Sequence, residues 1–177
     1  MSEYKRIPRT PRNRGFERVS EMQWAKDIDG LKVVGYNSIL LPKRSTMNSA
    51  GYDIFSTSSF FLNPKQSIKI MTGIKAYMLK SEFLLVAPRS GMGFKYFVRL
   101  ANTVGIVDSD FYNNVNNEGH ISIKIRNESD EEILSVKEGD AIAQCIFIPY
   151  LTIDSDDATE IRTGGLGHTG RWAETKQ

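Results

Sequence analysis

The fold is decided by Ile121-Ser122-Ile123-Lys124-Ile125-Arg126, a stretch in which apolar and polar residues alternate without a break. Alternation with a period of two is typical of a β-strand with one buried face. Glu138-Gly139-Asp140 has the composition of a tight turn, and the apolar run Ala141–Ile148 that follows it is a second predicted strand. Ser67–Thr72 alternates as well, and Phe83–Ala87 is a short apolar run. Many short strands separated by turns, without a sustained period of 3.6 residues, predict an all-β sandwich or jelly roll.

The N-terminal residues differ from this β-rich centre. Residues 1–20 carry six basic side chains against Glu3 and Glu17, a local charge of +4 in a chain whose net charge is +2. We expect a solvated basic arm, and a nucleic-acid or partner contact is the alternative. Phe16–Val19 and Leu31–Tyr36 are both candidates for the first strand, with a short helix predicted over Glu21–Asp29.

Three segments follow from this pattern. We expect a basic N-terminal extension over residues 1–30, one β domain over residues 31–155, and a glycine-rich, flexible tail over residues 156–177. A chain of 177 residues has room for a single domain of this kind.

Composition excludes several classes of protein. No apolar run approaches the roughly 20 residues that span a bilayer, so we expect no membrane association and a cytoplasmic location. The single cysteine, Cys145, lies inside an apolar run and is expected to be a buried apolar side chain. His120 and His168 are far apart in the chain, which makes a zinc site improbable.

Two segments are suited to phosphate. Pro88-Arg89-Ser90-Gly91-Met92-Gly93 follows a predicted strand and offers a guanidinium, a hydroxyl and backbone N–H groups. Arg162-Thr163-Gly164-Gly165-Leu166-Gly167-His168-Thr169-Gly170 joins donors to glycines, but it lacks the lysine of a Walker A loop. Taken alone, the first is better explained as an ordinary glycine-rich connection and the second as a disordered tail.

Three further segments carry acid or amide groups. Asn102-Thr103-Val104-Gly105-Ile106-Val107-Asp108-Ser109-Asp110-Phe111 is consistent with a hairpin that carries a general base, and an Asx-capped turn is the alternative. Asp53, in Ala50-Gly51-Tyr52-Asp53-Ile54, is suited to a hard divalent cation. Gln144 is an amide in an otherwise apolar strand and needs polar partners.

These five segments, in this order, resemble the five motifs of the trimeric dUTP diphosphatase (dUTPase) family over roughly residues 38–170. The resemblance implies a distorted jelly roll, a homotrimer with active sites shared between subunits, and Mg²⁺-dependent hydrolysis of dUTP to dUMP and pyrophosphate. That reaction limits uracil in DNA. The resemblance also implies that the tail of one subunit closes over a pocket made by the other two.

The roles of individual residues are likewise implied by the resemblance. Asp108 would be the general base, and Asp53 would contact Mg²⁺ through water. The phosphates would be bound by Arg89, Ser90, Gly91, Gln144, Arg162, His168 and Thr169. The nucleoside pocket would be formed by Asn102, Gly105, Ile106, Val107, Phe111, Ser122 and Leu166.

The sequence departs from the family pattern around this pocket. Phe111 stands where the family usually has tyrosine, so the ring that excludes a 2′-hydroxyl is retained and discrimination against UTP is expected. About six extra residues follow Phe111 before Gly119. In the tail, Arg162 lies one residue nearer the glycines, and Leu166 replaces the aromatic residue that stacks on uracil, a role for which Trp172 is a candidate.

Two alternatives remain from the sequence. A dCTP deaminase has the same fold and resembles this chain around Arg89-Ser90, but it lacks the uracil hairpin and the glycine-rich tail. A binding or regulatory protein on this scaffold would be supported by the basic arm and the asparagine-rich insertion.

Overall fold

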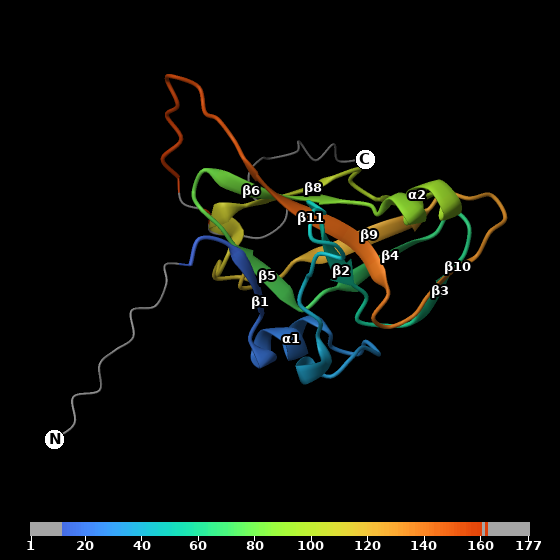
Figure 1. Cartoon of the computed structure of the whole chain (residues 1–177). Helices are drawn as coiled ribbons and strands as arrows, with labels where there is room; N and C mark the ends of the chain where they lie inside the picture. Colours follow the sequence, from blue (N-terminus) through green and yellow to red (C-terminus); the bar gives the residue numbers. More distant parts are fainter. Residues whose placement is uncertain (1–11, 161, 163–177) are drawn as a thin grey trace, which may run out of the picture.

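The computed structural model describes residues 12–160 and residue 162, and it confirms an all-β fold with short helical segments (Figure 1). The strands in chain order are β1 (Gly15–Arg18), β2 (Tyr52–Phe55), β3 (Phe60–Leu62), β4 (Ser67–Met71), β5 (Ile74–Tyr77), β6 (Glu82–Ala87), β7 (Val98–Leu100), β8 (Gly105–Asp108), β9 (Ser122–Asn127), β10 (Leu134–Val136) and β11 (Ala141–Pro149). The helical segments are α1 (Glu21–Asp27), α2 (Ser90–Tyr96) and the 3₁₀ turns η1 (Tyr36–Ser38) and η2 (Ser109–Phe111).

One antiparallel sheet, in the order β2-β11-β6-β8, positions the residues of interest. Its central strand β11 follows the predicted turn at Gly139, whose φ of +82° favours glycine. Gln144 in β11 lies opposite Asp53 in β2 and opposite Ala87 in β6. At the far end of β6, Phe83 lies opposite Asp108 in β8.

A second sheet, in the order β4-β9-β7, contains the alternating stretch at residues 121–126. Ile121, Ile123 and Ile125 are all buried, as their period of two predicts. Two further pairs, β1-β5 and β3-β10, complete the strand pairing. The apolar faces of these sheets share one core, which includes Leu84, Val86 and the free thiol of Cys145.

The N-terminal segment lies against the domain. Of the two candidate first strands, the structure has β1 at Gly15–Arg18, while residues 31–35 form no strand. The short helix is present as α1, and Trp24 on it is 2% exposed and belongs to the core. Arg14 binds Glu82, which anchors β1 beside β6. The expected N-terminal extension, residues 1–30, therefore includes two elements, β1 and α1, that pack into the β domain.

No helix in the described part of the chain is long and apolar enough to cross a membrane.

Candidate functional site

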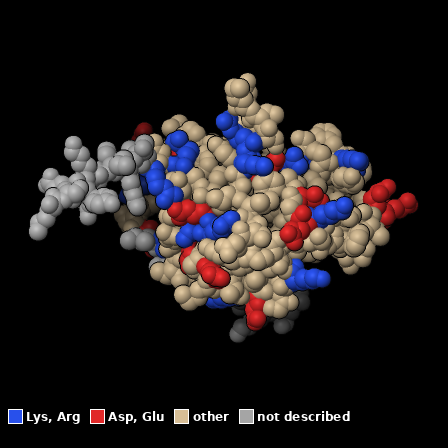
Figure 2. Space-filling model, turned by 60° about the horizontal axis from the view of Figure 1, so that its bottom comes forward, with Lys and Arg blue, Asp and Glu red and all other residues tan. Residues whose placement is uncertain are grey.

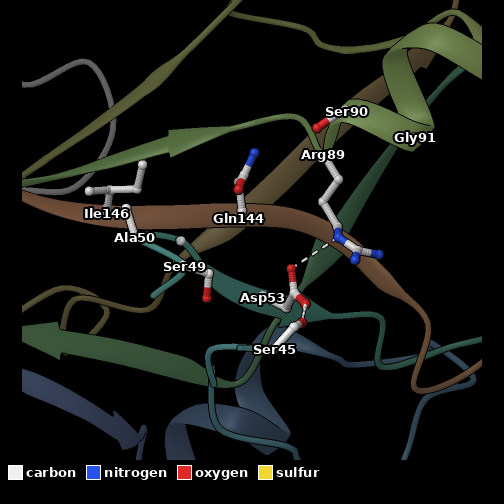
Figure 3. A pocket seen from close by; sticks show the side chains of 10 residues that line it. Ser45, Ser49, Ala50, Asp53, Arg89, Ser90, Gly91, Gln144 and Ile146 are labelled. Carbon is white, nitrogen blue, oxygen red and sulfur yellow. Dashed lines mark hydrogen bonds and ion pairs between the residues drawn. The ribbon is translucent and has the colours of Figure 1, made fainter. Parts of the chain in front are cut away.

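Side chains from three adjacent strands meet at a cavity of about 390 Å³ (Figure 3). Asp53 reaches it from β2, Gln144 from β11, and Arg89 from the segment that follows β6. The Nε atom of Arg89 lies 3.0 Å from Oδ1 of Asp53, and Ser45 donates a hydrogen bond of 2.7 Å to Oδ2. We call this group, with Ser90 and Gly91, the phosphate cradle.

The amide of Gln144 is fixed from two sides. Its Nε2 donates to the carbonyl of Pro88 at 3.0 Å, so the amide braces the segment that carries Arg89 and Ser90. On the other side, a Cβ atom at Gly51 would lie 2.5 Å from Oε1 of Gln144. The absence of a side chain at Gly51 leaves room for the Gln144 amide in this position.

Arg89 is partly available to a ligand. Its side chain is 42% exposed, whereas that of its partner Asp53 is 14% exposed. Ser90 begins helix α2, so backbone N–H groups of the first helical turn, including that of Gly91, have no acceptor earlier in the helix. The cradle therefore combines a guanidinium, a hydroxyl and N–H donors, all of which suit phosphate oxygens.

A β-hairpin carries Asp108 at the opposite end of the sheet. It follows the bridge between Leu100 and Thr103 and continues as β8. Gly105 allows β8 to approach β6 closely, since a Cβ there would lie 3.1 Å from Cβ of Val86. Asp108 is half exposed at the end of β8, and the 3₁₀ turn η2 follows directly.

The tail residue Arg162 binds this hairpin. Its guanidinium lies 2.5 Å from Asp108 Oδ2 and 2.8 Å from Asp110 Oδ1. Its Cζ atom also lies 5.9 Å from the ring centre of Phe111, within the range of a cation–π contact. Asp110 was not among the site residues predicted from the sequence. Its signal was present in its spacing, two residues from Asp108 and next to Phe111.

The asparagine-rich insertion forms a compact turn against Phe111. Asn114 is buried; its Nδ2 donates to the carbonyl of Phe111 and to Asn117, and its Oδ1 accepts from two backbone N–H groups. Gly119 closes the turn with a φ of +79°, where a Cβ would lie 2.5 Å from the carbonyl oxygen of Phe111. The insertion therefore fixes the backbone of Phe111, the residue that the family resemblance predicts to exclude a 2′-hydroxyl.

The insertion also holds the N-terminal helix. Glu118 accepts hydrogen bonds from the backbone N–H and the hydroxyl of Ser20, the N-cap of α1, and pairs with Lys75 at 3.2 Å. Burial would raise the pKa of Glu118, but the hydrogen bonds from Ser20 and Lys75 hold that pKa below its usual value. The two segments outside the common motifs are thus joined to each other.

A buried histidine completes this contact. Nε2 of His120 accepts from the backbone N–H of Gly73 at 2.8 Å, so Nδ1 carries the proton that faces Asp27 at 2.6 Å. Burial lowers the pKa of His120, although Asp27 acts in the opposite direction. His120 therefore serves as a neutral structural link between α1 and the β domain.

The other expected site residues lie in different parts of the chain, and some lie outside the described residues. Asn102, Ile106 and Val107 lie on the hairpin with Asp108, while Ser122 lies in β9 opposite Met71. Leu166, His168, Thr169 and the candidate Trp172 fall outside the described residues. Sequence reasoning missed Ser45 and Ser49, which line the cavity from the segment before β2.

The fold, the order of the motifs and these two groups of residues define a dUTPase-like protein. The dUTPase family model matches residues 37–170, and the chain belongs to the dUTPase family. The deoxyuridine 5'-triphosphate nucleotidohydrolase of Lactococcus lactis is 41% identical over 159 residues, which cover 89% of this chain and 97% of that protein.

Solved structures give the same result. The crystal structure of the dUTPase from Streptococcus mutans is 35% identical, has a TM-score of 0.64, and covers 79% of this chain and 98% of its own. A point mutant of the dUTPase from phage phi11 of S. aureus, whose structure is described as showing the coordination of a structural Mg(II) ion, is 22% identical. That structure has a TM-score of 0.56 and covers 73% of this chain and 95% of its own, which shows a shared fold.

Proposed function

We propose that this protein hydrolyses dUTP to dUMP and pyrophosphate, with Asp108 as the general base. The observation that carries the proposal is the pair of polar groups on one sheet: a cradle suited to phosphate at one end and a half-exposed carboxylate at the other. Membership of the dUTPase family and the names of its relatives supply the substrate. Such an enzyme limits the incorporation of uracil into DNA, and a cytoplasmic location suits it.

In the proposed reaction, Asp108 accepts a proton from a water molecule as that water attacks the α-phosphorus of dUTP. A bond forms from the water oxygen to the α-phosphorus, and the bond from the α-phosphorus to the bridging oxygen breaks. Pyrophosphate departs with that oxygen. Because charge accumulates on the phosphate oxygens, Arg89, Ser90 and Gln144 act by holding and neutralising them.

The residues of the cradle fit a magnesium ion that is held mainly by the nucleotide. Mg²⁺ in nucleotide sites keeps several waters and takes its remaining ligands from phosphates and one or two carboxylates. Asp53 is a single carboxylate whose oxygens already bind Arg89 and Ser45, which favours contact through water. When bound, the ion would neutralise phosphate charge.

The distance between the two groups argues that one active site takes residues from different copies of the chain. Asp108 lies opposite Phe83, and Gln144 lies opposite Ala87 on the same strand. The extended backbone from residue 83 to 87 spans about 13 Å. A base must lie within hydrogen-bond reach of its water, so the cradle and the base of one chain cannot serve the same phosphate.

A homotrimer with shared sites accounts for this separation. The hairpin also presents apolar side chains to solvent, since Ile106 is 63% exposed and Val104 is 42% exposed. Exposed apolar groups beside a polar site are typical of contact surfaces. We propose that the hairpin of one copy faces the cradle of another, with the nucleotide between them.

The nucleoside is assigned to the hairpin. Asn102, Gly105 and the backbone at Ile106 and Val107 would read uracil, and Phe111 would exclude a 2′-hydroxyl. Ser122, in β9, and Leu166, His168 and Thr169, in the tail, keep their proposed roles in binding the nucleoside and the phosphates.

Product analysis tests the proposal. The protein is incubated with dUTP, UTP, dCTP and dTTP in the presence of Mg²⁺, and both pyrophosphate and ammonia are measured. We expect pyrophosphate from dUTP alone, and loss of turnover when the metal is chelated. Ammonia from dCTP would instead identify a deaminase, and comparable turnover of UTP would refute the role of Phe111.

In the described part of the basic arm, the arginine side chains bind groups of the protein itself. Arg12 pairs with Glu17, Arg14 pairs with Glu82, and Arg18 donates to the carbonyl of Ile39. On the face shown in Figure 2, basic and acidic side chains are interspersed. The alternative of nucleic-acid binding by the arm therefore concerns residues 1–11, which lie outside the described residues. Its test is removal of those residues alone, because β1 begins at Gly15.

A further inference from the structure

The residue that follows Phe111 is anchored on the N-terminal strand. The hydroxyl of Tyr112 donates a hydrogen bond of 2.5 Å to Oε2 of Glu17 in β1. Oε1 of Glu17 accepts a bond of 2.6 Å from Arg12, so both carboxylate oxygens have a partner. The bond from Tyr112 lowers the pKa of Glu17, while burial raises the pKa of Tyr112 and the bond to Glu17 adds to that effect. At neutral pH the contact is therefore a charge-assisted hydrogen bond between a phenol and a carboxylate.

The strand pair β1-β5 also holds the ring of Tyr112. Glu17 lies opposite Lys75 in β5, and Tyr77 follows on the same face of that strand. The ring centres of Tyr77 and Tyr112 are 5.9 Å apart, and Nζ of Lys75 lies 5.5 Å from the centre of the Tyr112 ring. Lys75 also donates to Oδ1 of Asn113 at 2.7 Å. Two consecutive residues of the insertion are thus bound by one face of this strand pair.

The anchor acts on Phe111 through the backbone. Phe111 ends the 3₁₀ turn η2, and Tyr112 is the C-cap residue of that turn, with an extended backbone. The two residues share a peptide group, whose oxygen accepts the bond from Asn114 at 2.8 Å. A shift of Tyr112 therefore changes the position from which the ring of Phe111 projects, and the phenol of Tyr112 is a second fixed point beside Asn114.

We propose that Glu17 is a positioning residue of the nucleoside pocket, which increases the preference for dUTP over UTP by holding Tyr112 and with it the ring of Phe111. This inference rests on the proposed function, in which Phe111 excludes a 2′-hydroxyl. Glu17 precedes residue 37, where the match to the family model begins. This determinant of specificity thus lies outside the matched region.

Exclusion of a hydroxyl depends on how firmly the excluding ring is held. A hydrophobic pocket rejects a substrate that merely adds a hydroxyl by only about 10²-fold. A displacement of about 1 Å caused by a residue remote from the chemistry can change a rate by a similar factor. A ring of Phe111 that can retreat leaves room for the 2′-hydroxyl of UTP, whereas dUTP gains nothing from that room. Loss of the Glu17 bond should therefore raise turnover of UTP relative to that of dUTP.

The test compares kcat/KM for dUTP with kcat/KM for UTP in full-length variants. In Glu17→Ala and in Tyr112→Phe we expect the ratio of the two values to fall about five- to tenfold, because a hydrogen bond to a charged group is lost. The double variant should fall no further, since each change removes the same bond. Glu17→Gln keeps an oxygen acceptor for the phenol and should retain most of the wild-type ratio.

Arg14→Ala is the matched control, because it removes the ion pair with Glu82 that anchors the same strand. It should lower the midpoint of thermal unfolding and leave the ratio unchanged. An unchanged ratio in both Glu17→Ala and Tyr112→Phe, or an equal fall in Arg14→Ala, would show that Glu17 only stabilises the fold and would overturn the inference. A double variant whose ratio falls by the product of the two single effects would overturn it as well, because Glu17 would then act by a route other than Tyr112.

The wild-type protein separates this inference from the proposed function. Absence of pyrophosphate from dUTP would refute the function, and comparable turnover of dUTP and UTP would refute the role of Phe111; either result removes the basis of the inference. Turnover of dUTP with a preference that the variants at Glu17 and Tyr112 retain would refute the inference alone.

Discussion

The phosphate cradle and the Asp108 hairpin lie at opposite ends of the same sheet, and they are built in different ways. In the cradle, strand register places Asp53, Gln144 and the Arg89 segment side by side, and each side chain already has a partner. The hairpin is more exposed, and its surroundings come from the insertion and Arg162. The proposed phosphate-binding groups are thus preorganised by the sheet, whereas the proposed base, Asp108, depends on segments outside the sheet.

Replacement of the base should have the largest effect. Asp108→Asn keeps the shape of the side chain but removes the proton acceptor, so we expect turnover of dUTP to fall on the order of 10³-fold or more. Binding of a non-hydrolysable dUTP analogue should be largely retained, as measured by calorimetry. Unchanged turnover would show that Asp108 is not the general base.

The cradle can be disturbed at Gly51, which lines the cavity beside Gln144. Gly51→Ala would place a Cβ 2.5 Å from Oε1 of Gln144, so the amide that donates to the carbonyl of Pro88 must shift. We expect kcat/KM to fall about tenfold, because one hydrogen bond to the phosphate-binding segment is lost. Gly35→Ala, where nothing lies within 4 Å of the added Cβ, is the matched control. Equal effects of the two would show that the brace is unimportant.

The support of the hairpin can be tested in the insertion. Asn114→Ala leaves two backbone N–H groups without their acceptor and removes the side-chain donor to the carbonyl of Phe111. We expect the free energy of unfolding to fall by about 2 kcal/mol in denaturant titrations, and the preference for dUTP over UTP to weaken. Asn116→Ala, at an exposed position of the same turn, should change neither quantity. A neutral Asn114→Ala would show that Phe111 is held without the insertion.

The smallest effect is expected at the anchor of the tail. Asp110→Asn removes one of two ion pairs to Arg162, and exposed pairs of this kind contribute about 0.2–1 kcal/mol. We expect KM for dUTP to rise about two- to fivefold while kcat changes less. Asp157→Asn, exposed in the segment before Arg162, is the control for the change in charge. A fall in kcat at constant KM would contradict the role of Asp110.

The sequence predicted the elements whose signal is local. The alternation at residues 121–126 and the turn at Gly139 have the expected structures, because each reflects burial of one strand face or one special backbone angle. The ends of the chain were harder to predict. The basic charge of residues 1–20 suggests a solvated extension over residues 1–30, yet Arg14 and Arg18 are bound by groups distant in the sequence, the Glu82 carboxylate and the Ile39 carbonyl.

The candidate site also combines features with a local sequence signal and features that depend on contacts between distant segments. Motif order predicted roles for Asp53, Arg89, Gln144 and Asp108, but no local pattern revealed that the register places Asp108 at the far end of β6. Asp110 and Ser45 were missed for a related reason. Their roles depend on which side chains face them, and that is fixed by contacts between segments far apart in the sequence.

The contact between Glu118 and Ser20 makes the turn after Phe111 and the helix α1 depend on each other. The family model begins at residue 37, so α1 precedes the matched region, and Glu118 belongs to the turn added after Phe111. If either segment were lost, the other would retain partly buried polar groups without their partners. The helix and the turn therefore form one structural unit, in which the turn supplies the acceptor for the N-cap of α1.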